Sequence, residues 1–248
     1  MKRAFDLVAS LVGLVALSPI LLPVAVVIWL QDFHSPFYVA MRTGRWGRPF
    51  RMVKFRSMVV RADRTGVDST SGDDPRITPL GRLIRRFKLD EFPQLWCVIR
   101  GDMSLVGPRP NVQRETALYT SEERELLSVR PGITDLASIA FSDEGEILRG
   151  SADPDLKYNQ VIRPWKSRLG LLYVQGGGSV WLDLRVILLT VWSAADRAGA
   201  LRAVARLVRG LGGDEGLARV AGRNEPLTAA PPPGASDIVR SRTLAPTS

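Results

Sequence analysis

The first thirty residues constrain the fold of this chain more than any other feature. Residues 4–30 are almost wholly apolar. A run of this length can cross a bilayer, for which about 20 apolar residues suffice. The apolar core of a secretory signal peptide is shorter, about 7 to 15 residues. The sequence therefore predicts an N-terminal helix embedded in a membrane.

Two features favour a re-entrant helix over a spanning one. Ser18-Pro19 and Pro23 lie inside the run, where proline removes a backbone donor and kinks a helix. Basic residues lie on both sides of the run, at positions 2 and 3 and again between positions 42 and 54. The positive-inside rule then keeps both ends in the cytoplasm. We expect a re-entrant helix over residues 1–33, broken at Ser18 and Pro19, with a spanning helix as the alternative.

Composition narrows the chemistry of the remaining chain. The formal net charge of +9 favours partners that carry phosphate, such as nucleic acid, anionic lipid or a nucleotide. Nucleic acid is disfavoured because the basic residues are not interleaved with stacking aromatic residues. Cys97 is the single cysteine and His34 the single histidine, which excludes an intrachain disulfide and argues against histidine triads and zinc sites. Catalysis then falls to carboxylates, Lys, Tyr or Ser.

Hydrophobic periodicity predicts short strands and helices after the membrane segment. Residues 36–58 alternate around a glycine turn and indicate a hairpin, which places Lys54 and Arg56 on one side of its second strand. Residues 77–88 predict a basic amphipathic helix that packs on a core or lies in a membrane interface. Residues 133–141 resemble a strand, and helices are expected near 154–162, 164–174, 180–194 and 198–209. Residues 211–248 lack periodicity and predict a disordered tail.

Adjacent carboxylates at Asp90 and Glu91 follow a turn that carries Arg85 and Lys88. One interpretation is that Asp90 caps the helix that starts here, because Asp is a favoured N-cap. The alternative is a binding site. Neighbouring carboxylates resist joint ionisation unless a cation intervenes, and Mg²⁺ binds through one or two carboxylates together with substrate phosphates.

A rigid corner follows at Gly107-Pro108-Arg109-Pro110. The two prolines fix the backbone on both sides of Arg109. Rigid presentation of a guanidinium suits bidentate binding of phosphate or carboxylate, although a solvated arginine in a proline corner is the simpler alternative.

These motifs together resemble the bacterial sugar transferases, which are monotopic polyprenol-phosphate phosphoglycosyl transferases, in their minimal form with the catalytic domain alone. The matching pieces are Lys2–Leu30 with Ser18-Pro19, KFRSM at Lys54–Met58, TPLGRLIRRFKLDEFPQLW at Thr78–Trp96, RGDMSLVGPRP at Arg100–Pro110 and RPGIT at Arg130–Thr134.

The resemblance implies an α+β fold that is mostly helical: a kinked re-entrant helix, interfacial amphipathic helices and a small β-hairpin. Residues 34–210 would form the catalytic domain on the cytoplasmic face of the inner membrane. Its partners would be a UDP-sugar, polyprenol (undecaprenyl) phosphate and membrane lipid, with Mg²⁺ as cofactor and no nucleic acid. The oligomeric state, a homodimer included, stays open.

The resemblance also implies roles for particular residues. Asp90 matches a nucleophile that attacks the sugar-bearing phosphate, and Glu91 matches its Mg²⁺-binding partner. Arg109, with Pro108 and Pro110, matches a nucleotide-binding corner. Arg85 matches a phosphate contact, and we add Lys54 and Arg56 as candidate substrate-binding residues. UMP would leave, and polyprenol phosphate would take the phosphosugar from the aspartate in the first membrane-bound step of surface-glycan assembly.

Two departures and two rival functions accompany this expectation. Asp135 and Ser138 stand where the family commonly has Gly and Gln, which bears on the choice of sugar. A membrane-attached glycosyltransferase would move the sugar without its phosphate and release UDP. A non-catalytic basic module would only bind the membrane.

Overall fold

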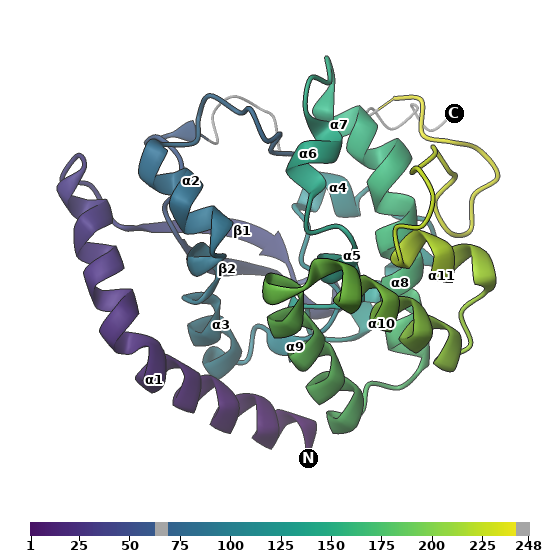
Figure 1. The fold of residues 1–248 in the computed structure, drawn as a ribbon, viewed down its shortest axis with the longest axis horizontal. Coiled ribbons are helices and arrows are strands. Elements are labelled where there is room, and N and C mark those ends of the chain that lie inside the picture. Colours follow the sequence, from purple (N-terminus) through teal and green to yellow (C-terminus); the bar gives the residue numbers. More distant parts are fainter. Residues whose placement is uncertain (63–68, 242–248) are drawn as a thin grey trace.

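The computed structural model describes residues 1–62 and 69–241, so residues 242–248 of the predicted tail lie outside the described residues. The chain forms two small sheets surrounded by helices (Figure 1). In chain order the elements are α1 (Lys2–Leu30), β1 (Phe37–Thr43), β2 (Pro49–Phe55), α2 (Pro79–Arg86), α3 (Gln94–Arg100), β3 (Ser104–Val106), α4 (Gln113–Thr116), β4 (Gly132–Thr134), α5 (Leu136–Ala140), α6 (Glu144–Leu148), α7 (Pro154–Lys157), α8 (Arg163–Gln175), α9 (Val180–Ala195), α10 (Arg197–Gly210) and α11 (Glu215–Ala221).

The N-terminal apolar run forms one helix, α1, which contains both Pro19 and Pro23. The helix bends along its length (Figure 1), as internal proline predicts. The Ser18 hydroxyl donates to the Val15 carbonyl at 2.7 Å, so it bonds to the preceding turn. Within the described chain, α1 is the one helix long and apolar enough to cross a bilayer. A re-entrant path through a membrane stays a prediction.

The first turns of α1 are bound to the rest of the protein. Asp6 is 2% exposed, and its carboxylate accepts hydrogen bonds from the Ser104 hydroxyl at 2.9 Å and the Leu105 amide at 3.2 Å. Lys2 forms an ion pair with the buried Asp183. A buried carboxylate without partners would be costly. These contacts therefore fix α1 against β3 and α9.

The predicted hairpin is confirmed. β1 and β2 pair antiparallel, with Phe37 opposite Phe55 and Thr43 opposite Pro49. One face of the hairpin packs on α3 through a small cluster of buried residues: Ala40, Phe50, Met52, Cys97, Val98 and Met103. The hairpin therefore brings the end of β2 close to the segment that precedes α3.

The second sheet is a parallel pair, β3 with β4, in which Ser104 aligns with Gly132 and Val106 with Thr134. The expected strand over residues 133–141 is thus wrong beyond Thr134. Asp135 ends it, because its carboxylate accepts from the Ser138 amide at 2.6 Å and starts α5. Such a side chain caps a helix N-terminus and satisfies a backbone donor.

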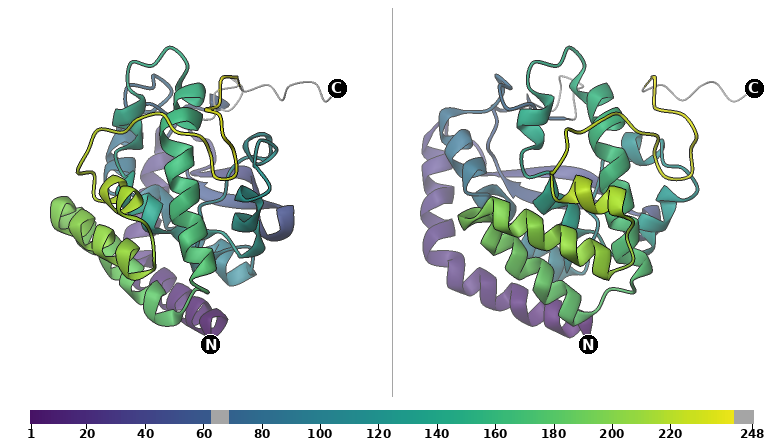
Figure 2. Two further views of the ribbon diagram at one scale, coloured as in Figure 1. Left: turned by 90° about the vertical axis from the view of Figure 1, so that its right-hand side faces the viewer. Right: turned by 45° about the vertical axis from the view of Figure 1, so that its right-hand side comes forward.

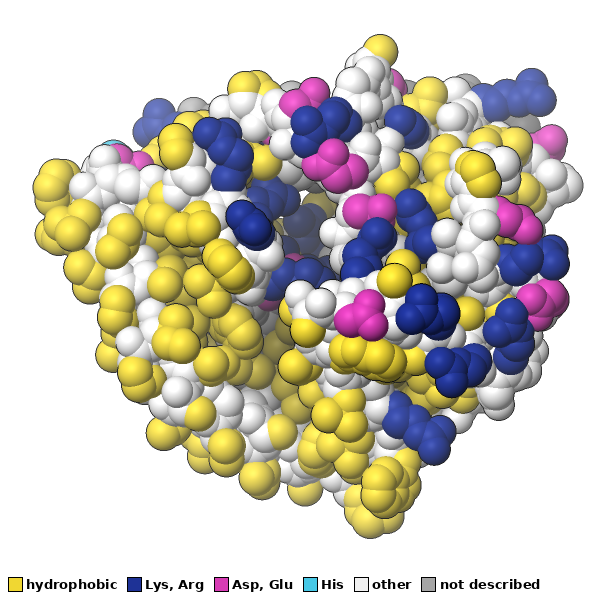
Figure 3. Space-filling view, viewed as in Figure 1, with side chains coloured by type: hydrophobic (Ala, Val, Ile, Leu, Met, Phe, Trp, Pro, Cys, Tyr) yellow, Lys and Arg dark blue, Asp and Glu magenta, His cyan; other side chains and the backbone are white. Residues whose placement is uncertain are grey.

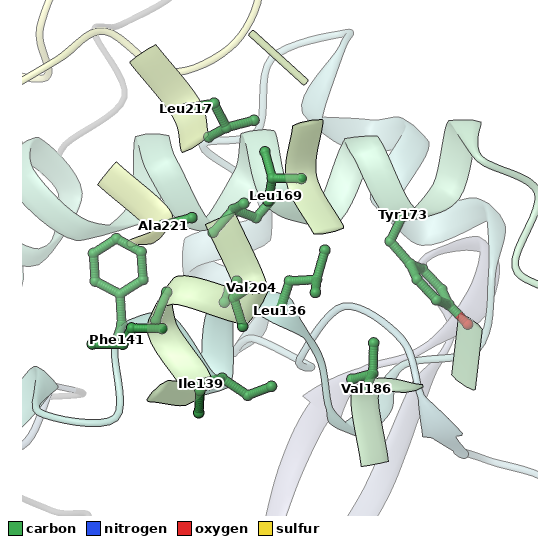
Figure 4. Packing of buried hydrophobic residues seen from close by; sticks show 14 of the residues in the cluster. Leu136, Ile139, Phe141, Leu169, Tyr173, Val186, Val204, Leu217 and Ala221 are labelled. Atoms are coloured by element: carbon green, nitrogen blue, oxygen red, sulfur yellow. The ribbon is translucent and has the colours of Figure 1, made fainter. Parts of the chain in front are cut away.

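Helices α5 and α8–α11 enclose the largest hydrophobic core. α9, α10 and α11 lie one above another on one side of the molecule (Figure 2). α5 is short and central, and its buried side chains meet those of α8, α10 and α11 (Figure 4). Helices predicted near 164–174, 180–194 and 198–209 are confirmed as α8, α9 and α10.

Residues 211–241 differ from the disordered tail that composition predicted. Asp214 caps α11 through a 2.7 Å bond from the Leu217 amide. Ala218 and Ala221 are fully buried, because small side chains allow α11 to pack closely on the core. Overall composition hid this short helix, whose cap and buried face are local signals.

Candidate active site

Asp90 and Glu91 lie in a single 3₁₀ turn, Leu89–Glu91, between α2 and α3. Lys88 precedes this turn in the left-handed region, with φ of +53°, and redirects the chain. No side chain caps α3, whose N-cap is Pro93. The alternative in which Asp90 caps the following helix is therefore wrong, and its carboxylate is left for another role.

Glu91 is held by Arg109. The two guanidinium nitrogens Nη2 and Nη1 donate to Glu91 Oε1 at 2.7 Å and Oε2 at 3.0 Å. Nη1 also donates to the Ile133 carbonyl at 2.6 Å. The side chains of Glu91 and Arg109 are 25% and 27% exposed. The proline corner after β3 thus presents a planar fork to Glu91, and the two form a bidentate pair.

The two neighbouring carboxylates have opposite pKa shifts. Burial, and then the charge of Glu91, raises the pKa of Asp90. Burial would also raise the pKa of Glu91, but the charges of Arg109 and Lys54 and the Arg109 hydrogen bonds outweigh it and lower that pKa to about 2. Glu91 is therefore a fixed anion, whereas the charged form of Asp90 is disfavoured and Asp90 has no matched cation of its own.

Three further cations face the same space. Lys54 at the end of β2, Arg85 on α2 and Lys88 line the cleft. In the part of the chain that the structure describes, none of the three has a side-chain hydrogen bond or ion pair. Burial and the charge of Arg109 lower the pKa of Lys54 to about 8. Unpaired cations in a shared hollow favour a ligand with several negative charges.

The cleft has a volume of about 540 Å³, within the usual range for small-molecule sites. Lysine and arginine side chains surround the hollow and lie within it, between α2 on one side and α5 and α6 on the other (Figure 3). Among the residues predicted as functional, the cleft is lined by Lys54, Arg85, Asp90, Glu91, Pro108, Arg109 and Pro110.

Arg56 is the exception among the predicted substrate-binding residues, because it is not among the residues that line the cleft. Its guanidinium donates to Asp32 at 2.5 and 2.6 Å and to the Ser35 carbonyl at 2.9 Å. β2 ends at Phe55, so the alternation that aligned Arg56 with Lys54 stops one residue too early. Arg56 instead ties the end of α1 to the hairpin.

Comparison with known protein families identifies the family of this chain. Residues 1–197 match the family model described as bacterial sugar transferase. The chain belongs to the bacterial sugar transferase family. The resemblance inferred from the motifs is thereby confirmed.

Several curated relatives of this sugar transferase carry informative names. An undecaprenyl-phosphate glucose phosphotransferase of Komagataeibacter xylinus is 40% identical over 202 residues, which cover 77% of this chain and 35% of that protein. A UDP-glucose:undecaprenyl-phosphate glucose-1-phosphate transferase of Caulobacter vibrioides is 34% identical, covering 77% and 68%. The uncharacterized sugar transferase EpsL of Bacillus subtilis is 37% identical, covering 77% and 85%. This sugar transferase thus spans about a third of the Komagataeibacter protein.

The sequence did not predict the residues of the far wall of the transferase's cleft, which is the wall opposite α2. Tyr158 and Lys166 line it, and the Lys166 ammonium lies 5.4 Å from the centroid of the Tyr158 ring. Tyr158 begins a π-helical turn, Tyr158–Ile162, between α7 and α8. Such turns are frequent at functional sites, but a π-helical turn has no apolar periodicity that would reveal it in a sequence.

Proposed function

We propose that this protein transfers a phosphosugar from a nucleoside-diphosphate sugar, a UDP-sugar, to polyprenol phosphate. The observation that carries the proposal is the state of Asp90. Its carboxylate accepts no hydrogen bond from any residue within 1–62 and 69–241, although it lines a cleft where Lys54, Arg85 and Arg109 all act on its charge. The names of the relatives support the same reaction.

The first step is a displacement at phosphorus. An Asp90 carboxylate oxygen attacks the sugar-bearing phosphorus of the donor, and the bond from that phosphorus to the bridging oxygen breaks. UMP leaves with the bridging oxygen and its electron pair. Covalent catalysis of this kind splits one difficult step into two easier ones. The phosphosugar then remains on Asp90 as an acyl phosphate.

The second step returns the enzyme to its starting state. A phosphate oxygen of polyprenol phosphate attacks the same phosphorus, and the bond from phosphorus to the Asp90 oxygen breaks. The products are polyprenyl-diphosphate-sugar and a free carboxylate, so no proton is consumed. Lys54, Arg85 and Lys88 stabilise the negative charge on the phosphoryl oxygens in both steps, because phosphoryl transfer depends mainly on positioning and charge.

Mg²⁺ fits this site only together with substrate phosphates. The described residues hold no cluster of three metal-ligating side chains, and both Glu91 oxygens already accept from Arg109. Mg²⁺ commonly takes one or two carboxylates and completes its shell with phosphate and water. Glu91, with Asp90, would hold the ion, which would neutralise phosphate charge when bound.

An apolar surface adjoins the cleft and suits a lipid acceptor. Leu83 on α2, Phe87 directly after α2 and Trp96 on α3 are more than half exposed, as is much of α1. Apolar side chains cover the lower left of the face that contains the hollow (Figure 3). Exposed apolar patches of this kind mark interaction or membrane surfaces. This surface supports the proposal that the protein lies on the cytoplasmic face of the inner membrane, where a soluble donor and a lipid acceptor would both reach Asp90.

The covalent route has a direct test. The purified protein, incubated with Mg²⁺ and a panel of UDP-sugars without acceptor, should gain the mass of one phosphosugar on the peptide that contains Asp90. Asp90→Asn should gain no mass and release no UMP. Turnover with acceptor but without any adduct would refute the covalent step. Release of UDP in place of UMP would favour a glycosyltransferase, and the absence of any nucleotide release would favour a binding module.

A further inference from the structure

Residues 198–241 lie beyond the part of the chain that matches the family, yet they complete the core behind the cleft. The short helix α5 separates residues 198–241 from the cleft. On one side, Ser138 and Phe141 line the cleft. On the other side, α5 packs against α10 and α11 (Figure 4). The contributing residues of α10 and α11 are Ala200, Leu201, Val204, Val208, Leu217, Ala218 and Ala221.

Arg223 connects α11 to the turn between α5 and α6. It follows α11 in the left-handed region, with φ of +55°. Its Nη2 donates to Asp143 Oδ2 at 3.1 Å, and its guanidinium lies 5.8 Å from the ring centroid of Phe141. The Arg223 side chain is only 19% exposed. The neighbours of Asp143 in sequence, Ser142 and Glu144, both line the cleft.

The segment after Arg223 also lies against the far wall of the cleft. The Ala230 amide donates to the Gln160 carbonyl at 2.9 Å, and the Gln160 side-chain amide donates to the Val239 carbonyl at 2.8 Å. Thr120 donates its hydroxyl proton to the Pro233 carbonyl at 2.5 Å. Gln160 belongs to the π-helical turn that begins with Tyr158. The C-terminal segment therefore crosses the helices that supply this wall (Figure 2).

We propose that residues 198–241 position the wall of the cleft opposite α2, and that Arg223 is the positioning residue for the turn between α5 and α6. Arg223 does not line the cleft, so it acts through Asp143 and Phe141. The turn sets the place of Ser142 and Glu144 relative to a bound donor. Small displacements of positioning groups cost much of the rate that a correctly oriented substrate provides.

The test compares Arg223→Gln with a matched control in full-length protein. Arg219 lies on the same helix and forms an ion pair with Glu225, at 3.0 Å, in which both side chains are about half exposed. Arg223→Gln should raise the KM for the UDP-sugar by about tenfold with kcat within about twofold. Arg223→Lys should restore most of the KM, and Arg219→Gln should leave it unchanged. Asp143→Asn should raise the KM at least as much as Arg223→Gln, because Asp143 Oδ1 also pairs with Arg197 at 2.9 Å.

A second measurement does not depend on the reaction. Hydrogen exchange of the backbone amides in residues 136–148 should be faster in Arg223→Gln than in wild type and unchanged in Arg219→Gln. Equal exchange in all three proteins would overturn the inference. A KM for Arg223→Gln equal to that of Arg219→Gln would also overturn it. So would a loss of activity in Arg223→Gln that is accounted for by a lower Tm. The kinetic arm rests on the proposed function. Absence of UMP release by wild type would refute that function, and the exchange arm would still decide the role of Arg223.

Discussion

The bidentate contact between Arg109 and Glu91 allows a quantitative prediction for Arg109→Lys. Lysine keeps the positive charge but offers a single ammonium in place of a planar fork. It can hold one Glu91 oxygen, so the second bond to Glu91 and the 2.6 Å bond to the Ile133 carbonyl are lost. A hydrogen bond to a charged group contributes about 1.5 to 3 kcal/mol.

Partial exposure reduces this value. Both side chains are about a quarter exposed, and solvent weakens such pairs. We therefore expect a loss of about 2 kcal/mol in transition-state stabilisation, which is about thirtyfold in kcat/KM. UMP release from a UDP-sugar in membranes containing polyprenol phosphate would measure it.

The matched control is Arg100→Lys. Arg100 also pairs with a carboxylate, Asp102 at 2.5 Å, but this pair is more exposed and lies outside the cleft. Its loss should change kcat/KM by less than about threefold. An Arg109→Lys variant within threefold of wild type, or an equal loss in Arg100→Lys, would refute the role assigned to the fork.

Three further predictions follow from single contacts. Lys54 is charged below its pKa of about 8 and neutral above it. We therefore expect kcat/KM for the donor to fall as pH rises through about 8. Lys54→Met should be less active at pH 7, and its pH profile should lack this fall. Gly132→Ala would place a methyl group 2.1 Å from the Gly107 amide nitrogen, which should cost about 3 kcal/mol and lower the Tm by about 6 to 12 °C in a thermal melt; an unchanged Tm would contradict this close approach. Asp6→Leu leaves the buried Ser104 hydroxyl without its acceptor and should cost about 1 to 3 kcal/mol, measured by urea unfolding, with no loss expected for the exposed Leu11→Ala.

The sequence was informative where a signal is local. The hairpin was predicted because alternation and a glycine turn determine strand pairing over a short stretch. The Asp90 pair and the proline corner were recognised as parts of one site from their residue types. Their direct contact was not predicted. Arg109 follows β3, which pairs with β4, and strands this short leave no pattern in the sequence that predicts their pairing.

Other features depend on tertiary contacts that no local pattern encodes. The alternation in the sequence places Arg56 on the same side of the strand as Lys54. In the structure, however, Asp32, which follows α1, binds its guanidinium. Asp135 interrupts an apolar run and was not recognised as a helix cap. Residues after 210 were judged by average composition, whereas Asp214 and the small buried residues of α11 act individually.

The two sheets also imply an order of events when the chain folds. β1 and β2 are joined by a short turn, so their pairing requires little loop closure and should occur early. β3 must wait for β4, which follows it only after α4 and a further 3₁₀ segment, Glu123–Ser128. Arg109 also donates to the Ile133 carbonyl of β4, so we expect its contact with Glu91 to become fixed only when that parallel pair has formed. A refolding chain should therefore acquire its hairpin before it becomes competent to turn over donor.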